Sequence, residues 1–190
     1  MNHRILFAPV IGFVLFHQVS SLPVWAADPA AIEDAARQSL GKEMWRGYRL
    51  PNGKLGCAAA LSNVLKQAGI TKVGSPLVTV LRKQLLSKGG PDKLVGVFCE
   101  IIVRNGEGRE ISDAALRKDC KPGDILLAFS SPPQNLNGGT SAHCGIMGKC
   151  SSGSYIVYTN NYIDGIWTEI EIHQMFDCYP YVRLLRLRGK

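Results

Sequence analysis

The sequence has few histidines and lacks the close cysteine pairs of a zinc site. Only 4 of its 190 residues are histidine, and no Cys-x-x-Cys pair is present. Because structural zinc is usually held by closely spaced cysteine and histidine ligands, we expect no metal centre. Internal repeats and low-complexity tracts are missing as well, which favours one ordinary globular domain.

No apolar run in the sequence is long enough to span a bilayer as a helix, which takes about 20 residues. Residues 5–16 are apolar, but they follow a basic start and precede a short polar stretch. Val24 and Ala26 then suit the small-residue positions of a signal-peptidase site. We therefore predict a signal peptide over residues 1–26, export to the periplasm or out of the cell, and no transmembrane segment in the mature form. An uncleaved anchor is the alternative.

Residues 27–190 are long enough to form a single domain with its own core. Acidic residues are the scarcer charge, 15 against 22 lysines and arginines, for a net charge of +7. In an exported protein this balance favours polyanionic surfaces such as cell wall or membrane phosphates, and we expect no nucleic-acid partner. The basic segment 183–190 alternates charged and apolar residues, which favours a strand with one solvent-facing side over a binding patch.

Cysteine is spread along the whole chain. The six positions are Cys57, Cys99, Cys120, Cys144, Cys150 and Cys178. Outside the cytoplasm an even number usually indicates disulfides, so Cys57 can be interpreted as half of a bridge. If Cys57 is instead a free nucleophile, the other five of the six cysteines can form at most two bridges.

Helix signals come first in the chain and strand signals second. Cap residues, first-turn prolines and closing glycines predict helices over 29–40, 57–68 and 77–87, and a short one over 112–117. After a Lys-Pro-Gly-Asp turn, strands are predicted over 125–130, 142–147, 155–160, 166–173 and 181–187, while 94–103 fits either a strand or a helix. This order predicts an α+β fold with an antiparallel sheet.

The predicted layers bring two reactive side chains together across a cleft. Cys57 opens a helix, where the helix dipole lowers a thiol pKa and free N–H groups can hold an oxyanion. Outside the predicted signal peptide the only histidines are His143, at the start of a strand, and His173, which reads as a surface residue. Cys57 is therefore the candidate nucleophile and His143 its base, with Asn160 as the residue that orients the imidazole and Asn161 as the alternate.

Four short motifs occur in an order that resembles the NlpC-type cell-wall peptidases. They are NGKLGCAAALSNVLKQAG at 52–69, KPGDI at 121–125, HCGIMG at 143–148 and TNN at 159–161. The resemblance extends over roughly residues 30–175. It implies a papain-like fold without a cofactor, and a cysteine peptidase that hydrolyses stem peptides of peptidoglycan, with Cys57, His143 and Asn160 in the roles given above.

The sequence departs from that family in three places. GCAA at 56–59 replaces the usual Asp-Cys-Ser-Gly, and the tyrosine that helps at the oxyanion site is either missing or moved to Tyr48. Cys144, next to His143, is expected to point into the core from the opposite side of the strand. It is also a candidate for a bridge with Cys150 or another cysteine.

Three other functions stay open at this point. An N-acetylmuramoyl-L-alanine amidase and an antibacterial wall-degrading effector have the same fold and nucleophile. An inactive, disulfide-stabilised cell-wall-binding module has Cys57 in a bridge. Of the other prominent side chains, we expect Trp45 and Trp167 to pack in the core and Asp124 to stabilise its turn.

Overall fold

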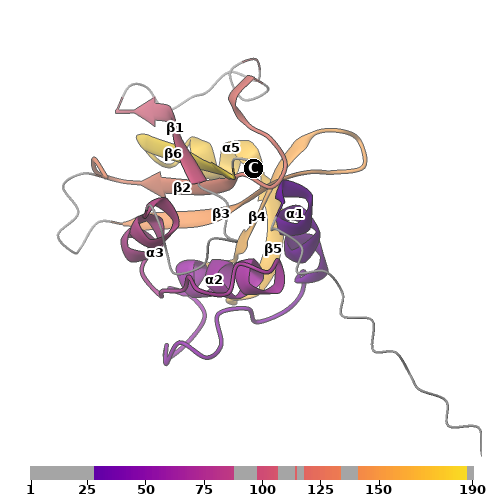
Figure 1. Ribbon diagram of the computed structural model, residues 1–190, viewed down its shortest axis with the longest axis vertical. Coiled ribbons are helices and arrows are strands. Elements are labelled where there is room, and N and C mark those ends of the chain that lie inside the picture. The colour runs from indigo at the N-terminus through magenta and orange to yellow at the C-terminus, as the bar shows by residue number, and fades with distance from the viewer. Residues whose placement is uncertain (1–27, 88–97, 107–113, 115–117, 134–140, 188–190) are drawn as a thin grey trace, which may run out of the picture.

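A computed structural model gives an α+β protein with an antiparallel sheet, as predicted (Figure 1). It describes residues 28–87, 98–106, 114, 118–133 and 141–187. The predicted signal peptide lies outside the described residues, and so does the predicted helix at 112–117 except for residue 114. No described helix has both the length and the apolar character that a membrane crossing requires.

The first two helices begin at the predicted residue, and the third begins one residue later than predicted. They are α1 (Pro29–Gln38), α2 (Cys57–Gln67) and α3 (Val78–Leu86). The carboxylate of Asp28 caps α1 by accepting the N–H of Ala31 at 2.7 Å, which stabilises a helix start. Gly69 follows α2 with φ +88°, the left-handed conformation that commonly closes a helix.

Six strands form one antiparallel sheet in the order β1-β6-β2-β3-β4-β5. Their bounds are β1 (Phe98–Asn105), β2 (Ile125–Phe129), β3 (Ala142–Lys149), β4 (Tyr155–Asn160), β5 (Trp167–Glu171) and β6 (Tyr181–Leu187). The segment that fitted either a strand or a helix is thus the edge strand β1. Strands β3 and β4 pair as neighbours, with Gly145 opposite Thr159.

The prediction of a strand through residue 173 is wrong at its end. Strand β5 stops at Glu171, and His173 belongs to a short helix, α5 (Ile172–Phe176). Ile172, Met175 and Phe176 are buried. Their spacing places them on one face of a helix, so packing against the sheet outweighs the alternation that precedes them.

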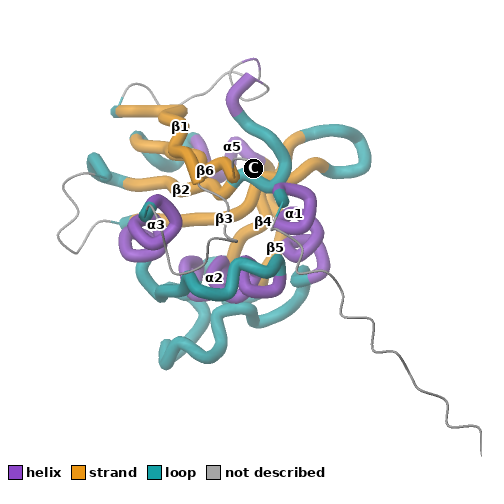
Figure 2. Tube along the Cα trace, in the orientation of Figure 1, coloured by secondary structure: helices purple, strands orange, loops and turns teal. Residues whose placement is uncertain are grey.

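Helices cover both faces of the sheet (Figure 2). One core lies between α1, α2, α3 and the sheet, and contains Cys57, Cys144 and Trp167. The second core lies on the opposite face, where Met147 and Val157 pack with α5. Trp167 is fully buried, and its indole N–H donates to the carbonyl of Ala36 at 3.0 Å, which confirms its packing role.

Strand β6 does not have the solvent-facing side that its alternating pattern predicted. It lies between β1 and β2, and Arg183 is 1% exposed. The Arg183 guanidinium donates to Asn105 Oδ1 at 2.7 Å, as a buried charged group requires. Arg186 forms two hydrogen bonds with Asp124, and Asp124 also accepts the N–H of Lys121 at 2.8 Å, so its predicted turn role is confirmed.

Candidate active site

The sulfur of Cys57 lies at the N-terminus of α2, against the first residues of β3. Cys57 is the first helical residue after Gly56, and the first turn carries no acidic side chain. Its Sγ is 3.9 Å from the carbonyl oxygen of Ala142, and the residue is 8% exposed. The first N–H groups of a helix have no partner within the helix and favour negative charge, so this position suits a thiolate.

Two neighbouring residues of β3 interact with the Cys57 sulfur. The hydrogen bond with the Cys144 thiol, followed by the hydrogen bond and the charge of His143, holds the pKa of Cys57 well below its ordinary value. The N–H of Ala58 contributes in the same direction, and burial of the sulfur opposes them. The structure thus brings the predicted nucleophile and the predicted base together.

Cys144 is the member of this group whose role sequence reasoning missed. The prediction that it points into the core is correct, since it is 0% exposed. Within that core it lies in the cluster that contains Cys57, and burial, together with the hydrogen bond to Cys57, raises the pKa of the Cys144 thiol. These opposite shifts make Cys144 the thiol that stays protonated beside Cys57.

The side chain that holds the His143 ring is Thr159, from β4. Thr159 Oγ1 lies 3.0 Å from His143 Nε2 and 2.7 Å from the carbonyl oxygen of Cys144. A carbonyl can only accept, so the single hydroxyl proton of Thr159 goes to Cys144. Oγ1 then accepts from Nε2–H, which leaves Nδ1 as the imidazole nitrogen available to the thiol of Cys57.

Asn160 lies beside the site and contacts the loop that leads to the nucleophile. Its Nδ2 donates to the carbonyl oxygen of Gly53 at 2.7 Å, and the same oxygen accepts the N–H of Gly56 at 2.9 Å. The amide oxygen of Asn161 accepts the N–H of Ile163 at 2.8 Å. Of the threonine and the two asparagines at 159–161, the described hydrogen bonds therefore connect only Thr159 to His143.

Two glycines let this loop pack closely on Trp45. A Cβ on Gly56 would lie 2.5 Å from the Trp45 Cβ, and one on Gly53 would lie 2.4 Å from the indole nitrogen. Both distances are shorter than real Cβ contacts allow. Trp45 thus packs against the core as predicted, and it supports the loop that ends at Cys57.

The sequence left Tyr48 as a possible hydrogen-bond donor at the oxyanion site. The hydroxyl of Tyr48 accepts from Lys66 Nζ at 3.0 Å, and Lys66 lies about 13 Å along α2 from Cys57 at 1.5 Å per residue. Tyr48 therefore does not supply a donor at the nucleophile. Tyr179 lies just before β6: burial raises the pKa of its phenol, a hydrogen bond with Ser141 lowers it, and the charge of Cys57 raises it further.

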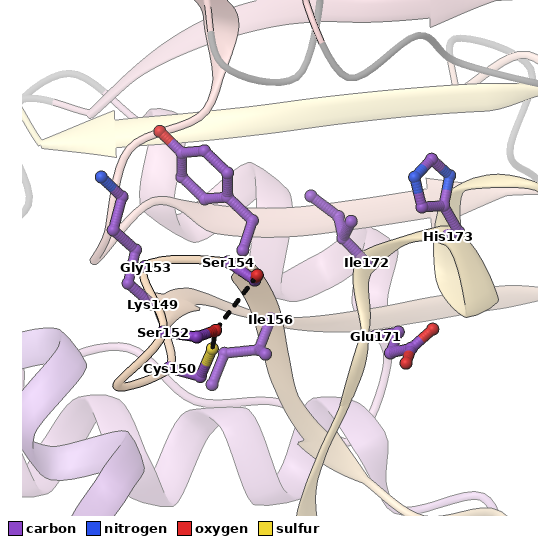
Figure 3. Close-up of a pocket in the computed structure, with 10 residues that line it drawn as sticks. Lys149, Cys150, Ser152, Gly153, Ser154, Ile156, Glu171, Ile172 and His173 are labelled. Carbon is purple, nitrogen blue, oxygen red and sulfur yellow. Dashed lines mark hydrogen bonds between the residues drawn. The ribbon is translucent and has the colours of Figure 1, made fainter.

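A separate pocket of about 810 Å³ opens near the far end of β3 (Figure 3). Its lining residues come from the β3–β4 hairpin and from the junction of β5 and α5: Lys149, Cys150, Ser152, Gly153, Ser154, Tyr155, Ile156, Glu171, Ile172 and His173. His173 is 44% exposed, with Nδ1 at 3.6 Å from Asp177 Oδ2, in keeping with the predicted surface position. This pocket contains neither Cys57 nor His143.

The six cysteines all carry free thiols in this structure. Among the described residues no cluster of three or more histidine, cysteine or acidic side chains could hold a metal ion. The chemistry available at Cys57 is therefore that of a polarised thiol beside an imidazole, with helix N–H groups close to the sulfur.

No protein-family model, no curated protein and no solved structure matches this chain. What the site does must follow from its own side chains. These are Cys57 at a helix start, His143 and Cys144 on the adjoining strand, and Thr159 behind the imidazole.

Proposed function

We propose that the protein is a cysteine hydrolase with Cys57 as nucleophile and His143 as base. The observation that carries this proposal is the position of Cys57 at the start of α2, where its Sγ lies 3.9 Å from the carbonyl oxygen of Ala142, the residue before His143. The lowered pKa of the Cys57 thiol, to which His143 contributes, supports it. A thiolate–imidazolium pair of this kind is the usual form of an activated cysteine nucleophile. Thr159 takes the orienting role that the sequence assigned to Asn160, because it is the residue bonded to Nε2.

In the proposed reaction, the Cys57 thiolate attacks the carbonyl carbon of an amide and the carbonyl oxygen becomes an oxyanion. The N–H groups at the start of α2 stabilise this charge. The C–N bond then breaks, and His143 gives its Nδ1 proton to the leaving amine, so that an acyl-Cys57 thioester remains. His143 next takes a proton from water, whose oxygen attacks the thioester and releases the acid and the thiolate.

The substrate that we propose is a stem peptide of peptidoglycan, and the protein would act there after export. The resemblance of its four motifs to NlpC-type peptidases supports this choice, as does the excess of basic side chains, at +7, which favours a polyanionic cell wall. A nucleophile helix packed on an antiparallel sheet, with the histidine on a strand, also fits a papain-like fold. No cofactor is needed for this chemistry.

The thiolate pair can be tested without a substrate, by brief alkylation of the purified protein with iodoacetamide at about pH 6, where an ordinary thiol is almost entirely protonated. Mass spectrometry of the peptides would identify the labelled cysteines. We expect Cys57 to be alkylated fast in the wild type and slowly in His143→Ala. His173→Ala is the matched control and should leave the rate unchanged.

Hydrolysis is then measured on purified peptidoglycan, with the products identified by mass spectrometry. We expect cleavage within the stem peptide and a loss of about 10²- to 10⁴-fold in His143→Ala, the usual contribution of a general acid–base group. Release of a stem-free muramyl sugar would instead identify an amidase. The proposal would be contradicted if Cys57 were inert to alkylation and the protein digested no peptidoglycan.

A further inference from the structure

The nucleophile of the proposed hydrolase has a second buried thiol as its neighbour. Cys144 is 0% exposed and shares the core cluster of Cys57, and the Cys57 sulfur lies 3.9 Å from the carbonyl oxygen of Ala142, two residues before Cys144 on β3. In keeping with this placement, the two thiols shift each other's pKa in opposite directions. Hydrolysis by a cysteine and a histidine does not require this second sulfur. Its position therefore calls for a chemical explanation.

The fold holds Cys144 rigidly in this position. Its strand is paired on both sides, to β2 and to β4, with Cys144 opposite Leu127. Its own carbonyl accepts the hydroxyl of Thr159 at 2.7 Å, so the backbone that carries the thiol is the one that carries His143 and is tied to the orienting residue. Movement of Cys144 away from Cys57 would disturb the imidazole as well.

The two sulfurs are unequal, and their difference fixes the direction of the hydrogen bond. Charge on Cys57 is favoured by the helix start and by His143, whereas Cys144 lies in the apolar core without a basic partner of its own. Cys57 is thus the sulfur that loses its proton, and Cys144 keeps its S–H group as the donor. Thiols are weak donors, but a charged acceptor strengthens such a bond.

We propose that Cys144 is a second working thiol of the site: in the reduced protein it donates a hydrogen bond to the Cys57 thiolate, and when a peroxide oxidises Cys57 it closes a Cys57–Cys144 disulfide. The first part rests on the proposed function, because it concerns the reactive nucleophile. The second part requires only the two sulfurs and an oxidant. The site would then have two states: a reduced state with an active Cys57 thiolate, and an oxidised state in which Cys57 and Cys144 form a disulfide.

The oxidation proceeds in two balanced steps. The Cys57 thiolate attacks one oxygen of hydrogen peroxide, the O–O bond breaks, and a sulfenic acid and hydroxide form. The sulfur of Cys144 then attacks the Cys57 sulfur, the S–O bond breaks, and hydroxide leaves with the Cys144 proton as water. A thiol reductant then reduces the disulfide by thiol–disulfide exchange, which returns both protein thiols and oxidises the reductant to its own disulfide.

The other cysteines provide an internal contrast. Cys150 has its sulfur 2.8 Å from the hydroxyl of Ser152, and the Cys99 thiol donates to the carbonyl of Arg186 at 3.5 Å. Among the described residues, Cys144 is the other buried cysteine in the core cluster of Cys57. A specific bridge, rather than random oxidation, is therefore the expectation.

The test compares the wild type with Cys144→Ser and Cys144→Ala, and uses Cys150→Ser as the matched control. Serine keeps an O–H donor but cannot form the bridge, and alanine removes both. After treatment with hydrogen peroxide and alkylation of free thiols, peptides are mapped without reduction. We expect a Cys57–Cys144 linked peptide in the wild type and in Cys150→Ser, and Cys57 sulfinic or sulfonic acid in both Cys144 variants.

Recovery provides the second measurement. Rapid alkylation of Cys57 should return after a thiol reductant is added to the peroxide-treated wild type, and should stay lost in both Cys144 variants. In the untreated proteins the midpoint of Cys57 alkylation against pH should move to higher pH in Cys144→Ala, and Cys144→Ser should stay closer to the wild type. Each variant is checked for folding by circular dichroism before use.

Two results would overturn the inference. One is a wild type in which Cys57 becomes sulfinic acid or pairs with a different cysteine. The other is a Cys144→Ala protein whose alkylation profile and recovery match the wild type. A specific Cys57–Cys144 bridge in a protein that digests no peptidoglycan would remove the proposed substrate and leave the thiol pair standing, so the two failures are distinguishable.

Discussion

The two ends of strand β3 each lie beside a cysteine whose thiol pKa is lowered, and the causes differ. At the start of the strand, Cys57 has its pKa lowered by Cys144 and then by His143, against the effect of burial. At the far end, the pKa of Cys150 is lowered first by the hydroxyl of Ser152. One sulfur has an acid–base partner, and the other has only hydrogen-bond donors.

Under the proposed function, this difference explains why a lowered thiol pKa is not sufficient for amide hydrolysis. A thiolate can attack a carbonyl at either end of the strand, but an amide is cleaved only if the leaving amine receives a proton. Cys57 has His143 for that purpose. The groups that lower the pKa of the Cys150 thiol are the hydroxyl and N–H groups of Ser152 and Ser154, and none of these is a general acid at neutral pH.

The first and largest test of the contrast replaces Thr159 by valine, which keeps the shape and removes the hydroxyl. His143 Nε2–H then loses its acceptor at 3.0 Å, so the imidazole is no longer held with Nδ1 toward the sulfur. A hydrogen bond to a charged group is worth about 1.5–3 kcal/mol, or about 10- to 100-fold in rate. We expect a loss of that size in Cys57 alkylation at about pH 6 and in hydrolysis, with Cys150 alkylation unchanged.

Thr159→Ser is the matched control, because it restores the hydroxyl. Recovery of most of the rate, and of the pH profile of Cys57 alkylation, would assign the effect to the hydrogen bond. Equal losses in the serine and valine variants would show that Thr159 acts through packing. Full activity in Thr159→Val would remove it from the site.

Asn160→Ala gives the second test, and its expected effect is on stability. The Asn160 side chain is 1% exposed, and its Nδ2 holds the carbonyl of Gly53 in the loop before Cys57. The Gly53 carbonyl keeps its bond to the N–H of Gly56, so the variant loses one net hydrogen bond, which is worth about 0.5–1.5 kcal/mol. We expect the free energy of unfolding, measured in urea, to fall by about that much.

The same variant separates the two polar residues at the end of β4. If Asn160 holds only the loop, the pH at which Cys57 alkylation is half-maximal stays where it is in the wild type. A shift of that midpoint like the one in Thr159→Val would return the orienting role to Asn160. The pair of variants therefore decides between the residue predicted from sequence and the residue that the structure places on the imidazole.

Much of this end of the molecule could be predicted from sequence, because local signals determine it. Asp28 and Pro29 begin a helix in any context that tolerates one, and the structure places α1 there. Cys57 follows a glycine-rich loop and opens an apolar, alanine-rich run, so its position at a helix start also follows from nearby residues. The helix-start position of the proposed nucleophile was thus within reach of sequence reasoning.

The residues that contact the imidazole and the proposed nucleophile could not be predicted from the sequence, because these contacts depend on long-range pairing. Whether residue 159 or 160 faces His143 is decided by the β3–β4 register, in which Gly145 lies opposite Thr159, and a shift of one residue exchanges the two faces. The contact of Cys144 with Cys57 depends on how α2 packs on the sheet. Neither feature has a signal in the adjacent sequence.

The smallest expected effect tests the other end of the strand, with Ser152→Ala. The Cys150 sulfur lies 2.8 Å from Ser152 Oγ, and this hydroxyl is the largest cause that lowers the Cys150 pKa. Its removal should raise that pKa, so less thiolate is present at a given pH and alkylation of Cys150 slows by a few-fold at about pH 7. Cys57 alkylation, measured in the same digest, should not change. If Cys57 slowed together with Cys150, the two ends of β3 would be coupled, and the separation between a thiolate with a base and a thiolate without one would no longer hold.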